Sequence, residues 1–286
     1  MKKPNSMRHL DDAIRRLSGN TPQGFMQART VMANAIVASM LPDGVVKGGS
    51  ALKMRFGDAE TRFTTDLDTA TALDPMRYAA QLDSNLRAGW EGFSGRVASR
   101  EPASPEGVPE QYVMQPYDVK LDYLGKPWCT VPLEVGHNEI GDAEIIDWAE
   151  LVDAGRLFEA MGFPSPGKAP LMPLDHQIAQ KLHAASGPGD RARDLIDLQL
   201  IIGRADVDLS ATRKTCERLF AYRKAQSWPP VVIKQDGWSD LYESLSDGLP
   251  VIENVDDAVQ WANELIARID SALLLACRKA QPKLLR

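Results

Sequence analysis

Apolar and polar positions follow a helical spacing at the start of the chain and alternate in strand-like fashion soon after. Apolar residues recur three or four positions apart over 11–17 and 25–41, which predicts two helices. A Pro-Asp-Gly break at 42–44 ends the second helix. Two strands are then predicted, one at Val45-Val46 and one in the β-branched, alternating stretch FTTDLDTATAL at 63–73.

The next segment continues the mixture of helix and strand. Residues 74–89 predict a helix with Pro75 in its first turn. A polar loop rich in proline and glycine follows at 101–110. Residues 111–136 then predict two strands joined as a hairpin at Leu124-Gly125-Lys126-Pro127. The first half of the chain therefore predicts a mixed sheet covered by helices.

The second half returns to a helical spacing. The proline-rich stretch 163–173 indicates a boundary, so we expect one lobe at 1–163 and another at 164–286. The helices expected in the second lobe cover 174–185, 191–203, 209–225 and 255–280. The pattern predicts an α+β fold with a mixed sheet in the N-terminal lobe and an all-helical C-terminal lobe.

Composition narrows the class of protein. A net charge of -6 and a pI of about 5.3 exclude a wholly basic nucleic-acid coat, but not a local basic groove. The three cysteines form no Cys-x-x-Cys pair, which argues against a zinc site or a disulfide framework. The N-terminus lacks the apolar core of a signal peptide, and no apolar run reaches the roughly 20 residues of a membrane span. We expect a cytoplasmic protein with no membrane partner.

Two carboxylates in the second strand are the first candidates for chemistry. Asp66 and Asp68 are two residues apart, so their side chains point to one face of a strand. Like charges that close repel one another, and a divalent cation removes the conflict. Mg²⁺ prefers a few carboxylates together with substrate phosphates. A strand end with two solvated aspartates is the simpler alternative.

A glycine turn precedes these carboxylates. Gly48-Gly49-Ser50 follows the first strand, and Arg62 comes shortly before Asp66. Glycine lets the backbone approach a ligand closely, and backbone N–H groups at a helix start bind anions. The alternative is a tight strand-to-helix turn with Ser50 as the N-cap. Together the turn and the carboxylates favour a site for a triphosphate and metal ions.

These motifs resemble the DNA-polymerase-beta-like nucleotidyltransferases, and more narrowly the AbiEii/AbiGii toxins of type IV toxin–antitoxin systems. GGSALKMR and RFTTDLD match the glycine turn and the Asp-x-Asp strand of that family. QKLHA, with Lys181, and RARDLIDL, with Asp194 and Asp197, match its later lysine and its Arg-Asp-x-x-Asp-Leu helix. The resemblance covers approximately residues 30–205.

The resemblance implies roles for these residues. A third carboxylate joins Asp66 and Asp68 at the metal, and Glu134 is preferred to Asp122 for this role. Lys181 contacts the nucleotide phosphates, as do Gly48, Gly49 and Ser50, with Arg62 as a helper. Asp194 positions Lys181 or lies beside it, whereas Asp197 is structural.

The resemblance also implies an activity and its partners. We expect Mg²⁺, or else Mn²⁺, to support transfer of a nucleoside monophosphate from an NTP to the 3′ end of tRNA, which blocks translation, and we expect a cognate antitoxin. Transfer to a protein side chain, and a non-catalytic nucleotide- or partner-binding module of this fold, stay open as alternatives. An antibiotic-modifying nucleotidyltransferase shares the early motifs but fits RARDLIDL poorly.

A basic cluster in the second lobe is a candidate RNA contact. Five Lys and Arg side chains lie between 213 and 224, with Phe220 and Tyr222 among them. RNA recognition uses phosphate pairing and base stacking, which need these residue types. A solvated helix face is the simpler interpretation.

Overall fold

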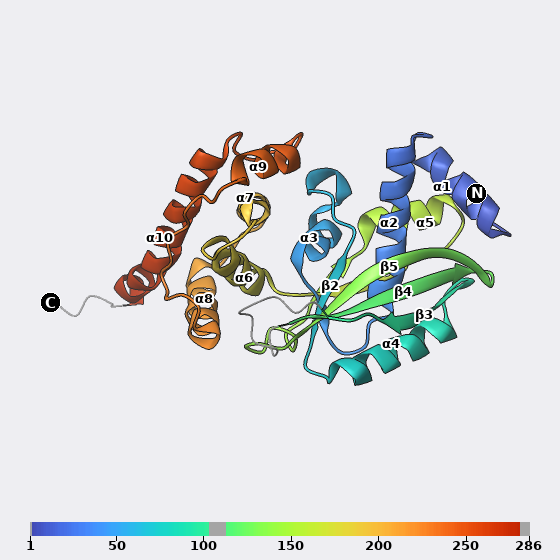
Figure 1. The fold of residues 1–286 in the computed structure, drawn as a ribbon, viewed down its shortest axis with the longest axis horizontal. Coiled ribbons are helices and arrows are strands. Elements are labelled where there is room, and N and C mark those ends of the chain that lie inside the picture. The colour runs from blue at the N-terminus through green and yellow to red at the C-terminus, as the bar shows by residue number, and fades with distance from the viewer. Residues whose placement is uncertain (1, 103–112, 281–286) are drawn as a thin grey trace. The chain divides into compact units, whose positions relative to one another are not determined.

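The computed structural model describes residues 2–102 and 113–280, with side chains described up to 272 (Figure 1). The chain divides into two compact units. Unit 1 comprises 1–59 and 63–172, and unit 2 comprises 60–62 and 173–286. The predicted loop at 101–110 lies almost wholly outside the described residues.

Unit 1 contains a seven-stranded mixed sheet with the strand order β3-β4-β5-β2-β1-β7-β6. β2 runs parallel to β5 and β1 runs parallel to β7, while the remaining neighbours are antiparallel. The strands are β1 (Val45–Val46), β2 (Leu67–Thr71), β3 (Phe93–Ser99), β4 (Gln115–Tyr123), β5 (Lys126–His137), β6 (Asp147–Glu150) and β7 (Lys168–Leu171). The predicted mixed sheet is confirmed.

The hairpin that joins β4 to β5 forms where the sequence predicts it. Leu124 and Gly125 make a two-residue turn, with φ values of 49° and 71°. Positive φ at both positions is the geometry that matches the right-handed twist of antiparallel strands. The turn therefore sets the register of β4 against β5 next to the hairpin, and an irregularity between Leu121 and Asp122 shifts it by one residue for the rest of the pair.

Alternation along the strands gives the sheet an apolar face and a polar face. On β4, Val119 and Leu121 are buried, and the Asp118 and Lys120 positions between them are only partly buried. The apolar residues join the large core of unit 1 together with helices. The helices of unit 1 are α1 (Met7–Leu17), α2 (Pro22–Ser39), α3 (Gly48–Phe56), α4 (Pro75–Ala88) and α5 (Val152–Ala160), with a short 3₁₀ turn at Asp58–Glu60.

Several elements of unit 1 have no clear signal in the sequence. β3, β6, β7 and α5 are short, and each of them carries a proline, a glycine or an exposed apolar side chain that blurs the pattern of apolar positions. β7 matters most for the boundary, because it pairs with β1 and so belongs to the sheet. Unit 1 consequently extends to Met172, beyond the boundary expected after Phe163.

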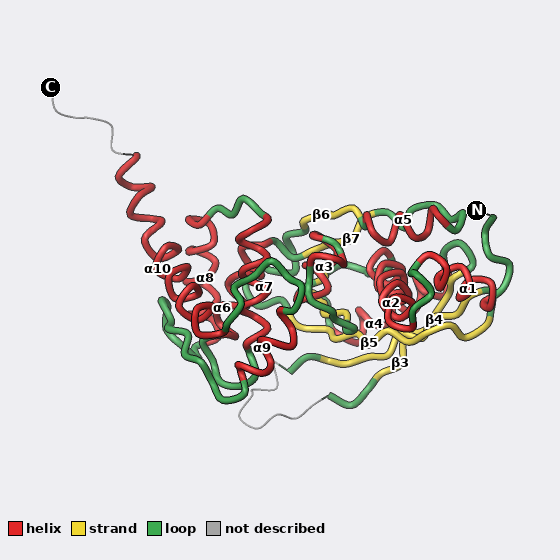
Figure 2. Tube along the Cα trace, turned by 90° about the horizontal axis from the view of Figure 1, so that it is seen from above, coloured by secondary structure: helices red, strands yellow, loops and turns green. Residues whose placement is uncertain are grey.

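All regular elements described in 173–280 are helices (Figure 2). They are α6 (Leu174–Ala185), α7 (Ala192–Arg204), α8 (Leu209–Arg223), α9 (Trp238–Ser246) and α10 (Val255–Ala280). Four of them match the predicted helices within one or two residues. α9 was not predicted because its nine residues give too short a pattern.

The short segment 60–62 belongs to unit 2, and Arg62 joins a buried ion network there. The Arg62 guanidinium donates two hydrogen bonds to the Asp197 carboxylate, at 2.9 and 3.0 Å. Lys181 Nζ lies 2.5 Å from Asp197 Oδ2, the oxygen that also accepts from Arg62 Nη2, and Asp197 is 1% exposed. Burial alone raises the pKa of Asp197, and Lys181 and Arg62 outweigh burial, so the pKa lies below its ordinary value.

None of the described helices is long and apolar enough to cross a membrane. Cys129 and Cys216 are both free thiols.

The Asp197 network predicts a large effect on stability. Asp197→Ala leaves two cations without their shared partner, so we expect unit 2 to lose roughly 3–5 kcal/mol of unfolding free energy at pH 7. Because the folded pKa is depressed, this contribution is present above about pH 4 and is lost as the pH falls through the folded pKa. Urea denaturation at several pH values measures both effects.

Asp206→Ala is the control, since Asp206 is an exposed aspartate close to Asp197 in sequence. Equal stability of Asp197→Ala and Asp206→Ala at pH 7 would show that the network does not hold unit 2 together.

Candidate functional site

Parallel pairing of β2 with β5 brings two of the predicted carboxylates together. Asp68 on β2 is directly opposite Glu134 on β5. Because paired residues in neighbouring strands point to the same face, both side chains lie on the polar face of the sheet. Asp66 comes one residue before β2 begins, and it is exposed. These three carboxylates form the acidic cluster of unit 1.

The acidic cluster is electrostatically coupled. Partial burial raises the pKa of Glu134, and the charges of Asp68 and Asp66 raise it further. Lys47 and Arg100 oppose this effect, but the pKa remains above its ordinary value. The three carboxylates are therefore close enough to repel one another. Such repulsion is typical of carboxylates that bind a cation together.

Lys47 is a member of this site that the sequence analysis did not identify. A side chain at Gly136 would place its Cβ only 2.9 Å from Lys47 Nζ, so the absence of a side chain there makes room for the ammonium group. Gly136 is two residues from Glu134, and Lys47 immediately precedes the glycine turn. Lysine before Gly-Gly-Ser was the available signal in the sequence.

The glycine turn packs directly against the acidic cluster. Gly48 has φ +65°, and a Cβ there would lie 2.4 Å from Asp68 Oδ2. Both the backbone conformation and the close approach of the carboxylate therefore require glycine at this position. The peptide N–H of Lys47 also donates to the Asp68 carbonyl at 2.8 Å. The structure thus brings the predicted turn and the predicted carboxylate together.

Ser50 does not cap the helix. α3 begins at Gly48 with Lys47 at the N-cap position, so Ser50 lies inside the first turn and the alternative of a serine N-cap is wrong. Its buried hydroxyl donates to the backbone carbonyl of Asp66 at 2.5 Å. In this structure Ser50 therefore fixes the backbone that carries Asp66, and phosphate binding by its hydroxyl stays a prediction.

The acidic cluster is not a closed metal site as it stands. Among the described side chains, those of 2–102 and 113–272, no three of His, Cys, Asp or Glu are arranged to hold one ion. Neighbouring carboxylates repel one another, so side chains of an acidic pair spread apart without a cation between them. The donor set itself, carboxylate oxygens from adjacent strands, is the type that Mg²⁺ and Mn²⁺ bind.

Asp122, the alternative third carboxylate, lies at the other end of the strand. It is opposite Pro127 beside the hairpin turn, seven residues along β5 from Glu134. At about 3.3 Å per residue this is roughly 23 Å. Asp122 also lies near Arg96, at 4.0 Å. The geometry favours Glu134 over Asp122 as the partner of Asp68.

The predicted lysine and its helix partners form a separate cluster in unit 2. Lys181 on α6 lies 3.3 Å from Asp194 Oδ1 and 2.5 Å from Asp197 Oδ2, both on α7. All three side chains are buried. Oδ2 of Asp194 is buried with no hydrogen-bond partner among the described residues. Arg62 joins this cluster through Asp197. Its contact with a nucleotide stays a prediction.

Comparison with known proteins connects these clusters to a family. The model of the nucleotidyl transferase AbiEii toxin family, described as a type IV toxin–antitoxin system, matches residues 31–267. This range includes the glycine turn, the acidic cluster and the Lys181 cluster. Among curated proteins, none matches the sequence significantly.

The solved structure of MenT4 shows a related fold. MenT4, a nucleotidyltransferase toxin from Mycobacterium tuberculosis H37Rv, is 17% identical with a TM-score of 0.53, and the match covers 93% of this chain and 98% of that chain. JHP933 from Helicobacter pylori is 15% identical with a TM-score of 0.47, and the match covers 91% of this chain and 97% of that chain. Because the family model spans most of the sequence, this chain belongs to the AbiEii nucleotidyltransferase toxins of type IV toxin–antitoxin systems.

Proposed function

We propose that this nucleotidyltransferase transfers a nucleoside monophosphate from an NTP to the 3′ end of tRNA, with Mg²⁺ as cofactor, and thereby blocks translation. The observation that carries the proposal is the pairing of Asp68 with Glu134 directly beside the Gly48 turn. A nucleotidyl transfer needs a cation site next to a phosphate-binding turn, and these elements adjoin in unit 1.

Asp66, Asp68 and Glu134 are the proposed metal ligands. Bound there, Mg²⁺ would offset the mutual repulsion of the carboxylates and polarise phosphoryl oxygens. Lys47 already supplies part of the compensating charge beside Glu134. Ser50 holds the Asp66 backbone, so the cluster is partly ordered before a cation binds.

The start of α3 is the proposed phosphate site. N–H groups in the first turn of a helix have no intrahelical acceptor, so those of Gly48, Gly49 and Ser50 suit an anion. The acceptor hydroxyl attacks the α-phosphorus, which forms the new phosphodiester bond, breaks the α–β bond and releases pyrophosphate. No residue becomes covalently modified, since positioning and charge compensation lower the barrier.

Lys181 on α6 is a further proposed phosphate ligand, and Asp194 is its proposed positioning partner. Asp194 and Asp197 hold the ammonium group in place, and Arg62 in turn holds Asp197. This network pairs the buried ammonium group with two carboxylates, so the lysine is not left without a counter-charge inside a helical unit. Arg62 then supports Lys181 through Asp197.

The acceptor can be tested directly. The protein, each labelled NTP in turn, Mg²⁺ and either intact tRNA, periodate-oxidised tRNA or total protein are incubated together. Label on intact tRNA and none on oxidised tRNA, which lacks a free 3′ hydroxyl, is the expected result. Label on protein would favour transfer to a side chain, and no label with any acceptor would favour a non-catalytic module.

Loss of an acidic-cluster charge should abolish transfer. Asp66→Asn and Asp68→Asn each remove a ligand for the cation, so we expect transfer to fall by about 100-fold or more. Asp122→Asn is the matched control, because it removes a carboxylate on β4 far from Glu134. Initial rates of label incorporation measure the effect. An equal loss of transfer rate in all three variants would show that any carboxylate removed from this region lowers the rate, and it would contradict a specific role for Asp66 and Asp68.

Glu134→Gln should abolish transfer and also stabilise the metal-free protein. A carboxyl with a raised folded pKa is harder to ionise in the folded state, so at pH 7 its charge destabilises the fold. The gain in unfolding free energy of Glu134→Gln should be present above the pKa that Glu134 has in the folded protein. It should vanish below the pKa of an unfolded glutamate, about 4.3. Thermal unfolding in EDTA across this pH range measures it. A lower melting temperature for Glu134→Gln at pH 7 would contradict the coupling of the acidic cluster.

Lys181→Gln should weaken NTP binding. A hydrogen bond to a charged group contributes about 1.5–3 kcal/mol, so the affinity should fall roughly tenfold or more. Isothermal titration with a non-hydrolysable NTP measures the affinity, and thermal unfolding reports the loss of the ion network. Lower stability with unchanged affinity would assign Lys181 to the packing of unit 2 alone.

A further inference from the structure

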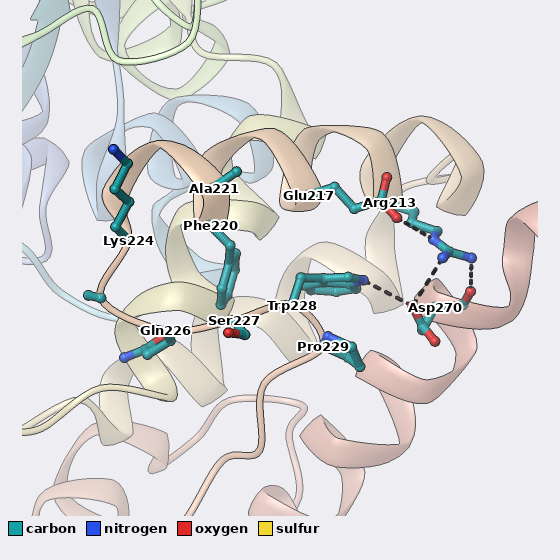
Figure 3. A pocket seen from close by; sticks show the side chains of 11 residues that line it. Arg213, Glu217, Phe220, Ala221, Lys224, Gln226, Ser227, Trp228, Pro229 and Asp270 are labelled. Atoms are coloured by element: carbon teal, nitrogen blue, oxygen red, sulfur yellow. Dashed lines mark hydrogen bonds and ion pairs between the residues drawn. The ribbon is translucent and has the colours of Figure 1, made fainter.

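Unit 2 contains a pocket that none of the proposed catalytic groups uses. It has a volume of about 760 Å³ and lies between α8, the 226–229 segment that follows it, and Asp270 on α10 (Figure 3). We call it the α8 pocket. Its size falls within the range of small-molecule sites and exceeds that of a single base.

One stripe of α8 forms a wall of this pocket. Arg213, Glu217, Phe220 and Lys224 follow one another at intervals of three or four residues, which is the spacing of one helix face. The basic cluster of α8 is therefore not a uniform solvated face. Arg213 and Lys224 face the pocket, whereas the exposed Lys214 does not line it.

Two aromatic rings lie in the middle of the pocket. Phe220 and Trp228 pack edge to face, with ring centroids 5.4 Å apart and an interplanar angle of 74°. The Trp228 indole N–H donates to Asp270 Oδ1 at 3.0 Å. The polar edge of the indole is thereby satisfied, and the ring is fixed against Phe220 while it still lines the pocket. A fixed, partly exposed indole is a platform for a planar ligand.

Charge is distributed unevenly along the pocket. At one end Arg213 bonds to Glu217 and Asp270, so one cation serves two carboxylates (Figure 3). Lys224 lies at the opposite end, beyond Phe220 (Figure 3). No ion pair of Lys224 occurs within the described residues, and the side chain is exposed. Ser227 and Gln226 add polar groups to the lining.

A ligand that matches this arrangement has a planar ring and an anionic group at one end. We propose that the α8 pocket binds one nucleotide unit of single-stranded RNA, with the base against Trp228 and a phosphate at Lys224. Stacking on an aromatic side chain and pairing of phosphate with a cation are the two main contributions to single-strand binding. The carboxylates at the other end repel phosphate and accept from hydroxyl or amino groups, so they orient the ligand.

The choice of RNA over a free nucleotide rests on the proposed function, because an enzyme that modifies an RNA end must hold the strand. The site itself is independent of the acidic cluster, since every lining residue belongs to unit 2. Binding can therefore be measured without transfer, in the full chain and in the presence of EDTA.

Fluorescence anisotropy with a labelled single-stranded RNA hexamer gives the affinity. Lys224→Gln and Trp228→Phe should each weaken binding about tenfold, in line with the contribution of one stacked base or one phosphate contact. Lys214→Gln, which makes the same charge change on the same helix outside the pocket, should leave the affinity within about twofold. Equal weakening by Lys214→Gln and Lys224→Gln would overturn the pocket in favour of diffuse attraction to a basic helix.

Intrinsic fluorescence provides a second readout that does not depend on the stability of the variants. Stacking should quench part of the emission of the six tryptophans, and the quenched part should be missing in Trp228→Phe. A separate competition experiment uses AMP and ATP. If either nucleotide displaces the hexamer at a concentration equal to or below that of unlabelled hexamer needed for the same effect, the pocket binds free nucleotide and not an RNA strand. Wild-type quenching that persists in Trp228→Phe would also overturn the proposal.

Failure of this proposal differs from failure of the proposed function. If transfer to tRNA is absent but Trp228→Phe abolishes hexamer quenching, the pocket is an RNA site in a protein with another acceptor. If transfer occurs but neither pocket variant alters hexamer binding, the proposed function stands and the α8 pocket is not where the strand binds.

Discussion

The candidate site depends on the parallel pairing of β2 with β5. This pairing places Asp68 opposite Glu134, and it can form only because the chain makes a long excursion through α4, β3 and β4 before β5 returns beside β2. A shift of one residue would send one of the two carboxylates into the apolar core, which the buried residues on either side of each carboxylate forbid. The apolar pattern of the core therefore fixes the position of the charged groups on the opposite face.

Residues close to the acidic cluster compensate its charge and hold its backbone in place. The ammonium group of Lys47 lies next to Gly136, and the Ser50 hydroxyl donates to the backbone carbonyl of Asp66. Gly48 has no side chain, which leaves room for the Asp68 carboxylate. These contacts all come from residues 47–50, which are the N-cap and the first turn of α3. The Gly-Gly-Ser turn thus has a structural part in assembling the acidic cluster, in addition to the phosphate-binding role that we propose for its backbone.

Much of this arrangement can be predicted from the sequence. The helices of unit 2 have long apolar stripes, and the hairpin has a Leu-Gly turn, so both were predicted with their residues. β6, at the edge of the sheet, and its neighbour β7 could not be predicted, because strands of four residues depend on pairing with distant residues. The same holds for the site: Asp66 and Asp68 share a motif, but Lys47 joins them only through Gly136 on another strand.

The three residues 60–62 determine which fragment of this protein contains all of unit 2. Arg62 is one of the two cations that compensate the charge of Asp197, and it lies more than a hundred positions away in sequence and is followed at once by residues of unit 1. A continuous fragment that starts at Pro173 would retain every helix of unit 2 and yet omit that guanidinium. The helical half is therefore encoded in two separate pieces of the gene, and cutting the chain at its apparent linker would leave an acid buried beside a single lysine.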